Sequence, residues 1–128
     1  MMTPDQFLRD YVSSPSLENT FSMIAEDAVY WFSNESHHVG KAAVEKAIRH
    51  NFETIKEETY RILDVQWIVE TEDTAVGLYR FEWSGKINGK PASGAGRGTT
   101  VLRRNGDSWL IAHEHLSKGG HQLPGALS

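Results

Sequence analysis

The chain contains no cysteine, which excludes a disulfide framework and a thiolate metal site. No stretch approaches the ~18 consecutive apolar residues of a membrane helix, so we expect no membrane contact. The opening residues, MMTPDQFLRD, lack the basic segment and the apolar run of a secretion signal. The sequence therefore predicts a cytoplasmic protein.

Positive charge is also sparse. The chain has 13 Lys and Arg against 17 Asp and Glu, which gives a net charge of -4. The basic residues are scattered, whereas nucleic-acid binding requires a concentrated basic surface, so we expect no nucleic-acid partner. The glycines of SGAGRG lead into another predicted strand rather than a helix, which excludes a dinucleotide-binding loop. No cofactor is expected.

Length and composition fit one domain. The 128 residues are 39% hydrophobic, enough for a single core. We expect this domain to span residues 1–117. The remaining KGGHQLPGALS is rich in glycine and has no clear periodicity, so it predicts a flexible C-terminal tail over residues 118–128.

The first part of the chain carries helix signals. In TPDQFLRDYV, Thr3 and Gln6 fit a capping box, with Pro4 at the first helical position. A second helical stripe runs through SLENTFSMIAED, and a third begins after Gly40 in KAAVEKAIRHNFETI. Between the second and third helices, AVYWF and HHV predict a short pair of strands.

From residue 58 onward the hydrophobic period changes to two, which predicts a meander of four strands with a hairpin turn at Asn88-Gly89. Gly94, Gly96 and Gly98 occupy alternate positions of one strand, where missing side chains allow a bend or a bulge. The order of elements predicts an α+β fold in which helices cover the concave face of a strongly curved sheet and enclose a cone. The strands look apolar on both faces, which predicts a homodimer through the outer face.

Three segments resemble a known family. FSMIAEDAVYWF, HHVGKAAVEKAI and GTTVLRRNGDSWLIAHEHLS resemble the SnoaL-like branch of the superfamily that includes ketosteroid isomerase, the nuclear transport factor 2 family and the association domain of the calcium/calmodulin-dependent kinases. The resemblance runs from Thr3 to Ser117. It implies a cone-shaped fold like that of nuclear transport factor 2, with three N-terminal helices on a mixed or antiparallel sheet.

The resemblance leaves several functions open, because one scaffold hosts many of them. It implies either a protein that binds a small apolar or alicyclic molecule, or a cofactor-independent acid/base enzyme of the isomerase, cyclase, dehydratase or hydrolase type. The alternative is a non-catalytic association module resembling the kinase association domain.

This chain differs from members of the superfamily at single functional positions. The general-base aspartate of ketosteroid isomerases corresponds here to Trp31 or Phe32, and neither accepts a proton. The pocket-facing arginines near the end of the kinase association domains correspond to Leu116 and Thr99, and an arginine of an earlier strand corresponds to Arg80.

The candidate catalytic residues are Arg80, Glu82 and Glu114. Limonene epoxide hydrolases use a carboxylate-arginine-carboxylate relay, and the RFE segment together with Glu114 resembles a glutamate version of it. In such a relay one carboxylate activates water while the other, held protonated, donates a proton. The alternative is a solvated salt bridge at the sheet edge.

The segment WLIAHEHLS places two histidines around Glu114. In a strand the histidines share one face and Glu114 lies on the other. If Leu116 faces the cone, as the resemblance implies, Glu114 does too. The outward set would then be Trp109, Ile111, His113 and His115.

Those histidines have two interpretations. They fit a structural role in a sheet-to-sheet dimer contact. A metal site would need His37 and His38 to converge with them, but neighbours in a strand diverge, and zinc needs three or four convergent ligands. No metal is expected.

The ligand-binding candidates are mostly aromatic or apolar. Tyr30 and Trp31, together with Thr99 and Leu116, are predicted to line an apolar pocket suited to a flat or alicyclic ligand. Arg97, within GAGRG, fits either the rim of that pocket or a solvated loop charge.

Overall fold

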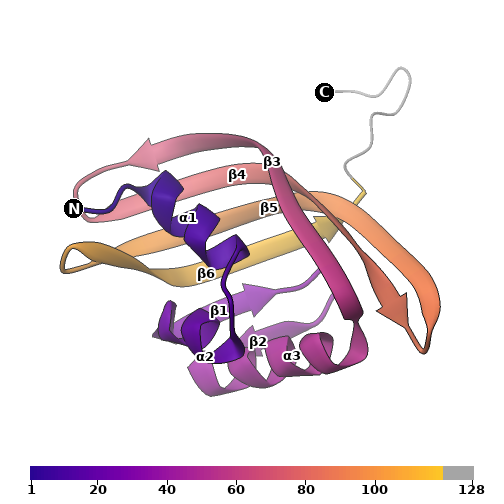
Figure 1. The fold of residues 1–128 in the computed structure, drawn as a ribbon. Coiled ribbons are helices and arrows are strands. Elements are labelled where there is room, and N and C mark those ends of the chain that lie inside the picture. The colour runs from indigo at the N-terminus through magenta and orange to yellow at the C-terminus, as the bar shows by residue number, and fades with distance from the viewer. Residues whose placement is uncertain (120–128) are drawn as a thin grey trace.

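A six-stranded curved sheet carries the helices on its concave side (Figure 1). The structure, a computed structural model, describes residues 1–119. Its elements are α1 (Pro4–Val12), α2 (Leu17–Ser22), β1 (Ile24–Trp31), β2 (His37–Val39), α3 (Lys41–Thr54), β3 (Lys56–Glu70), β4 (Thr74–Ile87), β5 (Lys90–Asn105) and β6 (Ser108–Lys118). The strand order is β2-β1-β6-β5-β4-β3, in which β1 pairs parallel to β6 and the other pairs are antiparallel. The predicted α+β class and the mixed sheet are confirmed.

The predicted boundary between the domain and its C-terminal tail falls within strand β6. Strand β6 continues to Lys118, one residue past the predicted domain end. The remainder of the predicted flexible tail, residues 120–128, lies outside the described residues.

The helix starts follow from the caps. The Thr3 side chain accepts a hydrogen bond from the Gln6 backbone at 3.1 Å, and the Gln6 side chain accepts one from the Thr3 backbone at 3.0 Å. This capping box satisfies two amides that an unfinished helix end leaves without partners. α1 then contacts β3 and β6, while α3 runs along β1 and β2 (Figure 1).

The second helix is shorter than predicted. The helical stripe suggested a helix through Ala25, but β1 begins at Ile24. The backbone amide of Ile111 donates to the carbonyl of Met23 at 2.9 Å, and Ile24 pairs with Ile111. Sheet pairing therefore takes the backbone groups that a longer helix would have used.

The three alternate glycines of β5 make room for aromatic rings. They pair across β4 with Tyr79, Phe81 and Trp83, whose rings lie where a Cβ would stand on Gly98, Gly96 and Gly94 respectively. The β4–β5 register is regular through this region, so the glycines produce no bulge. Instead they allow the β4 rings to lie against the β5 backbone on the concave side.

Strand β6 contains a bulge that sets which residues face the cone. Val101 pairs with His113 and Leu102 with Ile111, so Ala112 is an extra residue. The structure places Glu114 on the concave side, as expected. The expectation that Trp109 and Ile111 face outward is wrong, because the bulge resets the alternation and both are buried in the core.

Two features are absent from residues 1–119. No helix in this range is long and apolar enough to cross a membrane. No group of three or more His, Asp or Glu side chains within the same range is placed to hold a metal ion.

Candidate functional site

A cavity of about 240 Å³ lies inside the cone. This is slightly below the ~300–1,000 Å³ of pockets for drug-sized ligands, so it suits a molecule of one or two rings. The helices α1, α2 and α3 line one side of the cavity, and the sheet lines the other. The lining residues are Leu8, Tyr11, Val12, Leu17, Thr20, Tyr30, Phe32, Ile48, Asn51, Phe52, Glu58, Tyr60, Tyr79, Glu114 and Leu116.

Glu114 is the buried carboxyl of this cavity. The residue is 6% exposed. No hydrogen bond from residues 1–119 reaches its carboxyl oxygens, which open on the cavity. Burial raises the pKa of Glu114 to about 8, because an apolar surrounding disfavours the charged form. The group therefore carries a proton at neutral pH and can donate it.

Four phenols surround this carboxyl, one each from α1, β1, β3 and β4. They are Tyr11, Tyr30, Tyr60 and Tyr79. Burial raises the pKa of each well above the ordinary 10, and the Glu114 carboxylate raises it further. All four therefore stay protonated across the physiological range and lie within electrostatic reach of Glu114.

The phenols differ in whether their hydroxyls already have a hydrogen-bond partner. The hydroxyls of Tyr11 and Tyr30 are 2.9 Å apart, and those of Tyr79 and Thr100 are also 2.9 Å apart. Tyr60 stacks its ring on Phe81 at 5.8 Å between centroids, and within the part of the chain that the structure describes its hydroxyl has no hydrogen bond. Glu114 and Tyr60 are thus the buried groups left open to a ligand.

The predicted trio of Arg80, Glu82 and Glu114 does not converge. Arg80 donates to Asp64 at 2.8 Å and Glu82 accepts from Arg61 at 2.8 Å, both on the outer face of the sheet. The expectation that the three share a face is wrong, because β4 turns its other set of residues, with Tyr79 and Phe81, toward the core. The charges of Arg80 and Glu82 stay in water, where they need no desolvation.

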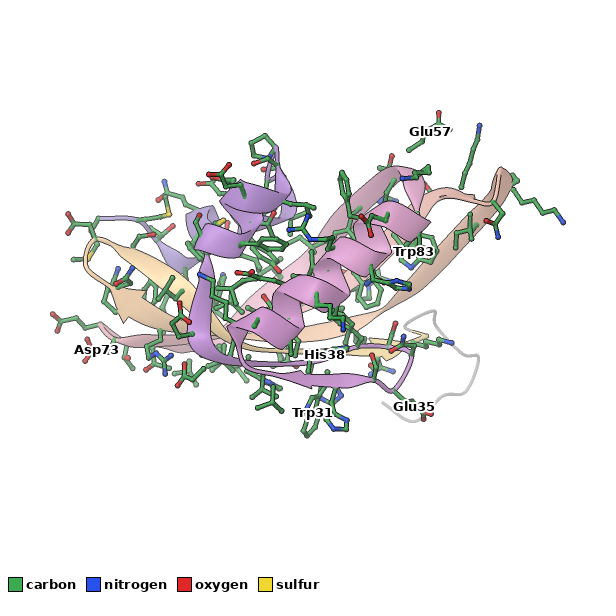
Figure 2. The ribbon with its side chains drawn as sticks, turned by 90° about the horizontal axis from the view of Figure 1, so that it is seen from below. Trp31, Glu35, His38, Glu57, Asp73 and Trp83 are labelled. Atoms are coloured by element: carbon green, nitrogen blue, oxygen red, sulfur yellow. The ribbon has the colours of Figure 1, made fainter. Side chains whose placement is uncertain are left out.

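The predicted ligand-binding residues divide in the same way. Tyr30 and Leu116 line the cavity, as expected. Trp31 lies on the convex side, 47% exposed, and points away from α3 (Figure 2). Thr99 pairs with His115 on that outer side, and Arg97, exposed, pairs with Ser117. The placement of Trp31, Thr99 and Arg97 in the pocket is therefore wrong, because each lies on the outward set of its strand.

The histidines of β6 also lie outside the cone. His113 contacts the carbonyl oxygen of Val29 through Nδ1 at 2.7 Å. The rings of His113 and His115 each make a T-shaped contact with the ring of Trp31, at 5.6 and 5.1 Å between centroids. They form a partly exposed aromatic cluster on the convex face.

Sequence reasoning missed Tyr11, Tyr60, Tyr79 and Glu58 as cavity residues. A signal for Tyr79 was present, since a two-residue turn at Asn88-Gly89 places it opposite Gly98. For Glu58 no local signal existed, because its orientation depends on a bulge at the start of β3.

Solved structures share the fold. An uncharacterised protein with a cystatin-like fold from Caulobacter vibrioides is 13% identical, with a TM-score of 0.77 over 91% of this chain and 87% of that one. A ketosteroid isomerase-like protein from Erwinia carotovora atroseptica is 22% identical, with a TM-score of 0.67 over 88% and 87%. A protein described as a calcium/calmodulin-dependent protein kinase type II association domain from Thiobacillus denitrificans is 20% identical, with a TM-score of 0.76 over 91% and 94%.

At these identities the likeness shows the fold alone. No curated protein matches the chain significantly. A family model for the SnoaL-like domain matches residues 4–119, which covers every helix and strand described above. The chain therefore belongs to the SnoaL-like domain family.

Proposed function

We propose that the protein binds a small, neutral, ring-containing molecule in the cone and acts on it by acid/base chemistry at Glu114. The observation that carries this proposal is the Glu114 carboxyl, buried, open to the cavity and without a hydrogen bond from residues 1–119. A ligand oxygen that accepts from Glu114 would give this carboxyl the hydrogen bond that residues 1–119 do not supply.

The surrounding groups support a neutral ligand. With Glu114 protonated, the inner end of the cavity holds hydrogen-bond donors and no net charge. An ammonium group would have to leave water for an uncharged site, and a carboxylate would meet apolar walls formed by Leu8, Ile48 and Leu116. A ketone or phenol oxygen loses less solvation and gains the hydrogen bond.

A set of naphthalene-sized probes tests the binding. We expect the wild type to bind 2-tetralone and 2-naphthol in calorimetric titrations, and to bind 2-naphthoate or 2-naphthylmethylammonium at least ~10-fold more weakly. Glu114→Gln should retain binding because its amide still donates. Glu114→Leu should lose about 10-fold in affinity, the ~1.4 kcal/mol of one hydrogen bond to the ligand.

Glu82→Gln is the matched control, because Glu82 lies on the outer face and pairs with Arg61. It should bind the probes as the wild type does. No binding of any neutral probe by the wild type would contradict the proposal and favour the non-catalytic association module. Equal loss in the Glu82 and Glu114 variants would contradict the location of the site.

We also propose that two copies pair through the convex face of the sheet. Val29, Val76, Leu78 and Val101 are only half-buried there, and Trp31 and Val39 are 47% and 68% exposed. Apolar side chains that gather on one exposed face are typical of an interface. A stable pair needs ~800 Å² of buried surface on each partner, and a sheet face can supply that area.

Sedimentation of the purified protein checks this pairing. The wild type should sediment at twice its 14.4 kDa chain mass, and Leu78→Arg should shift it to a monomer. Phe52→Arg is the control, because Phe52 is also exposed but lies on α3 at the cavity. A monomeric wild type at micromolar concentration would overturn the proposal.

A further inference from the structure

We propose that Glu58 is a second catalytic carboxyl, which removes a proton from carbon at the cavity mouth while Glu114 holds the substrate oxygen at the inner end. This inference rests on the proposed function of the cavity and adds to it the proton acceptor. It also narrows the substrate class to compounds with an acidic C–H near the oxygen that Glu114 holds.

A backbone irregularity sets the direction of Glu58, an exposed residue that lines the cavity. Lys56 pairs with Lys86 and Thr59 with Ser84, so Glu57 and Glu58 together lie opposite the single residue Gly85. Glu57 has a φ of 53°, in the left-handed region that non-glycine residues seldom adopt. Such strain costs ~1–3 kcal/mol and is concentrated at functional sites.

Gly85 permits this bulge. A Cβ on Gly85 would stand 2.8 Å from the carbonyl oxygen of Lys56 and 3.3 Å from the Cα of Glu58. The β3 backbone thus approaches β4 more closely than any residue with a side chain would allow. The result places Glu58 on the side of Tyr60, where it lines the cavity.

The neighbouring carboxyl points the other way. Glu57 pairs with Lys86 at 3.1 Å and projects away from the body of the molecule (Figure 2). Two adjacent glutamates therefore have different surroundings, one with a cation and one in the cavity mouth. Glu57 is the natural control for Glu58.

Tyr60 lines the cavity together with both carboxyls. Both Glu114 and Glu58 act electrostatically on its phenol, after the larger effect of burial. Its hydroxyl has no hydrogen bond within residues 1–119 and can donate to the substrate oxygen beside Glu114. Both carboxyls thus act on one phenol that would touch the substrate.

The chemistry balances with no co-reactant. The Glu58 carboxylate takes the proton of the C–H bond, whose electrons form a carbon-carbon double bond. The carbonyl π electrons move to oxygen, which takes the proton of Glu114 and gives an enol. Glu58 then returns its proton to carbon, at the same or a conjugated position, and the enol proton returns to Glu114.

The two carboxyls must be in opposite protonation states for this cycle. Burial raises the pKa of Glu58 above its ordinary 4.5, and the pKa of Glu114 is about 8. The titratable groups facing Glu58 and Glu114 across the cavity are Tyr11, Tyr30, Tyr60 and Tyr79. All stay protonated in this range, so the rate should rise with pH as Glu58 ionises and fall near pH 8 as Glu114 does.

Hydrogen exchange into 2-tetralone tests the assignment. In D₂O, the wild type should speed the uptake of deuterium at the carbon next to the carbonyl, measured by mass spectrometry. Glu58→Gln should slow this catalysed exchange by at least ~100-fold, the lower range of a general base. It should still bind 2-tetralone within about threefold, or ~0.6 kcal/mol, and lose the rising limb of the pH profile.

Glu57→Gln should exchange and bind as the wild type does. Catalysed exchange that survives in Glu58→Gln but is lost in Glu114→Gln would overturn the role of Glu58 and leave the proposed function standing. A wild type that binds 2-tetralone without speeding exchange would also overturn this inference. A wild type that binds no neutral probe would overturn the proposed function itself, and the inference with it.

Discussion

Replacing Glu114 with glutamine is expected to abolish most of the pH dependence of folding stability between about pH 5 and pH 9. In the wild type the pKa of Glu114 is about 8 when folded and near the ordinary 4.5 when unfolded. The folded state therefore binds more protons in this window, so the free energy of unfolding falls as pH rises. At ~1.4 kcal/mol per pH unit, the loss across this window is about 4 kcal/mol.

Urea unfolding at several pH values measures this effect. The wild type should be most stable near pH 5 and lose stability continuously to pH 9, whereas Glu114→Gln should stay nearly flat and exceed the wild type at high pH. Glu58 adds a smaller slope of the same sign, since its pKa is also raised. Glu82→Gln, on the outer face, should retain the wild-type slope. Parallel curves for the wild type and Glu114→Gln would show that Glu114 is ionised and solvated in the folded protein.

Gly96→Ala is expected to destabilise the protein by about 3 kcal/mol, the upper range for overpacking a core. The new Cβ would collide with the backbone carbonyl oxygen of Ser117 and would lie 2.7 Å from the ring of Phe81. The backbone contact cannot be relieved by rotating a side chain, so β5 and β6 would have to separate. Denaturant unfolding of the variant gives the change in free energy.

Gly94→Ala provides the comparison. Its Cβ would meet only the side chain of Trp83, among the three nearest atoms, and Trp83 is not fully buried. Because that ring can rotate toward solvent, the cost should be about 1 kcal/mol. Equal destabilisation by the two substitutions would mean that the β5–β6 contact at Ser117 is looser than described.

The parts of the fold that could be predicted are those with local causes. The capping box at Thr3 and the turn at Asn88-Gly89, with φ of 53° and 77°, depend on a few neighbouring residues. The order of helices and strands followed from the change of hydrophobic period. The end of α2 could not be predicted in this way, because Ile24 pairs with Ile111, which lies near the other end of the chain.

A site residue could be predicted only where the sequence of a single strand determines which face the residue occupies. Glu114 was found from its place in β6. Arg80 and Glu82 were assigned to the wrong face because both alternating sets of β4 contain apolar residues, Val76 and Leu78 on one side and Tyr79 and Phe81 on the other. The face is decided by the glycines of the next strand, which make space for rings. Glu58 depends on a bulge, and a bulge has no dependable signature in one sequence.

The bulge residue Ala112 decides which titratable side chains of β6 line the interior of the cone. With Trp109 and Ile111 fixed in the core, a strand of strict alternation would turn His113 and His115 inward and Glu114 to the solvent. The same sequence would then line the cone with imidazoles, which as a class titrate near neutrality, instead of the one carboxyl that keeps its proton. Inserting or deleting one residue between the core half and the cavity half of β6 would therefore replace the cavity acid by imidazoles, although the neighbouring residues stay the same.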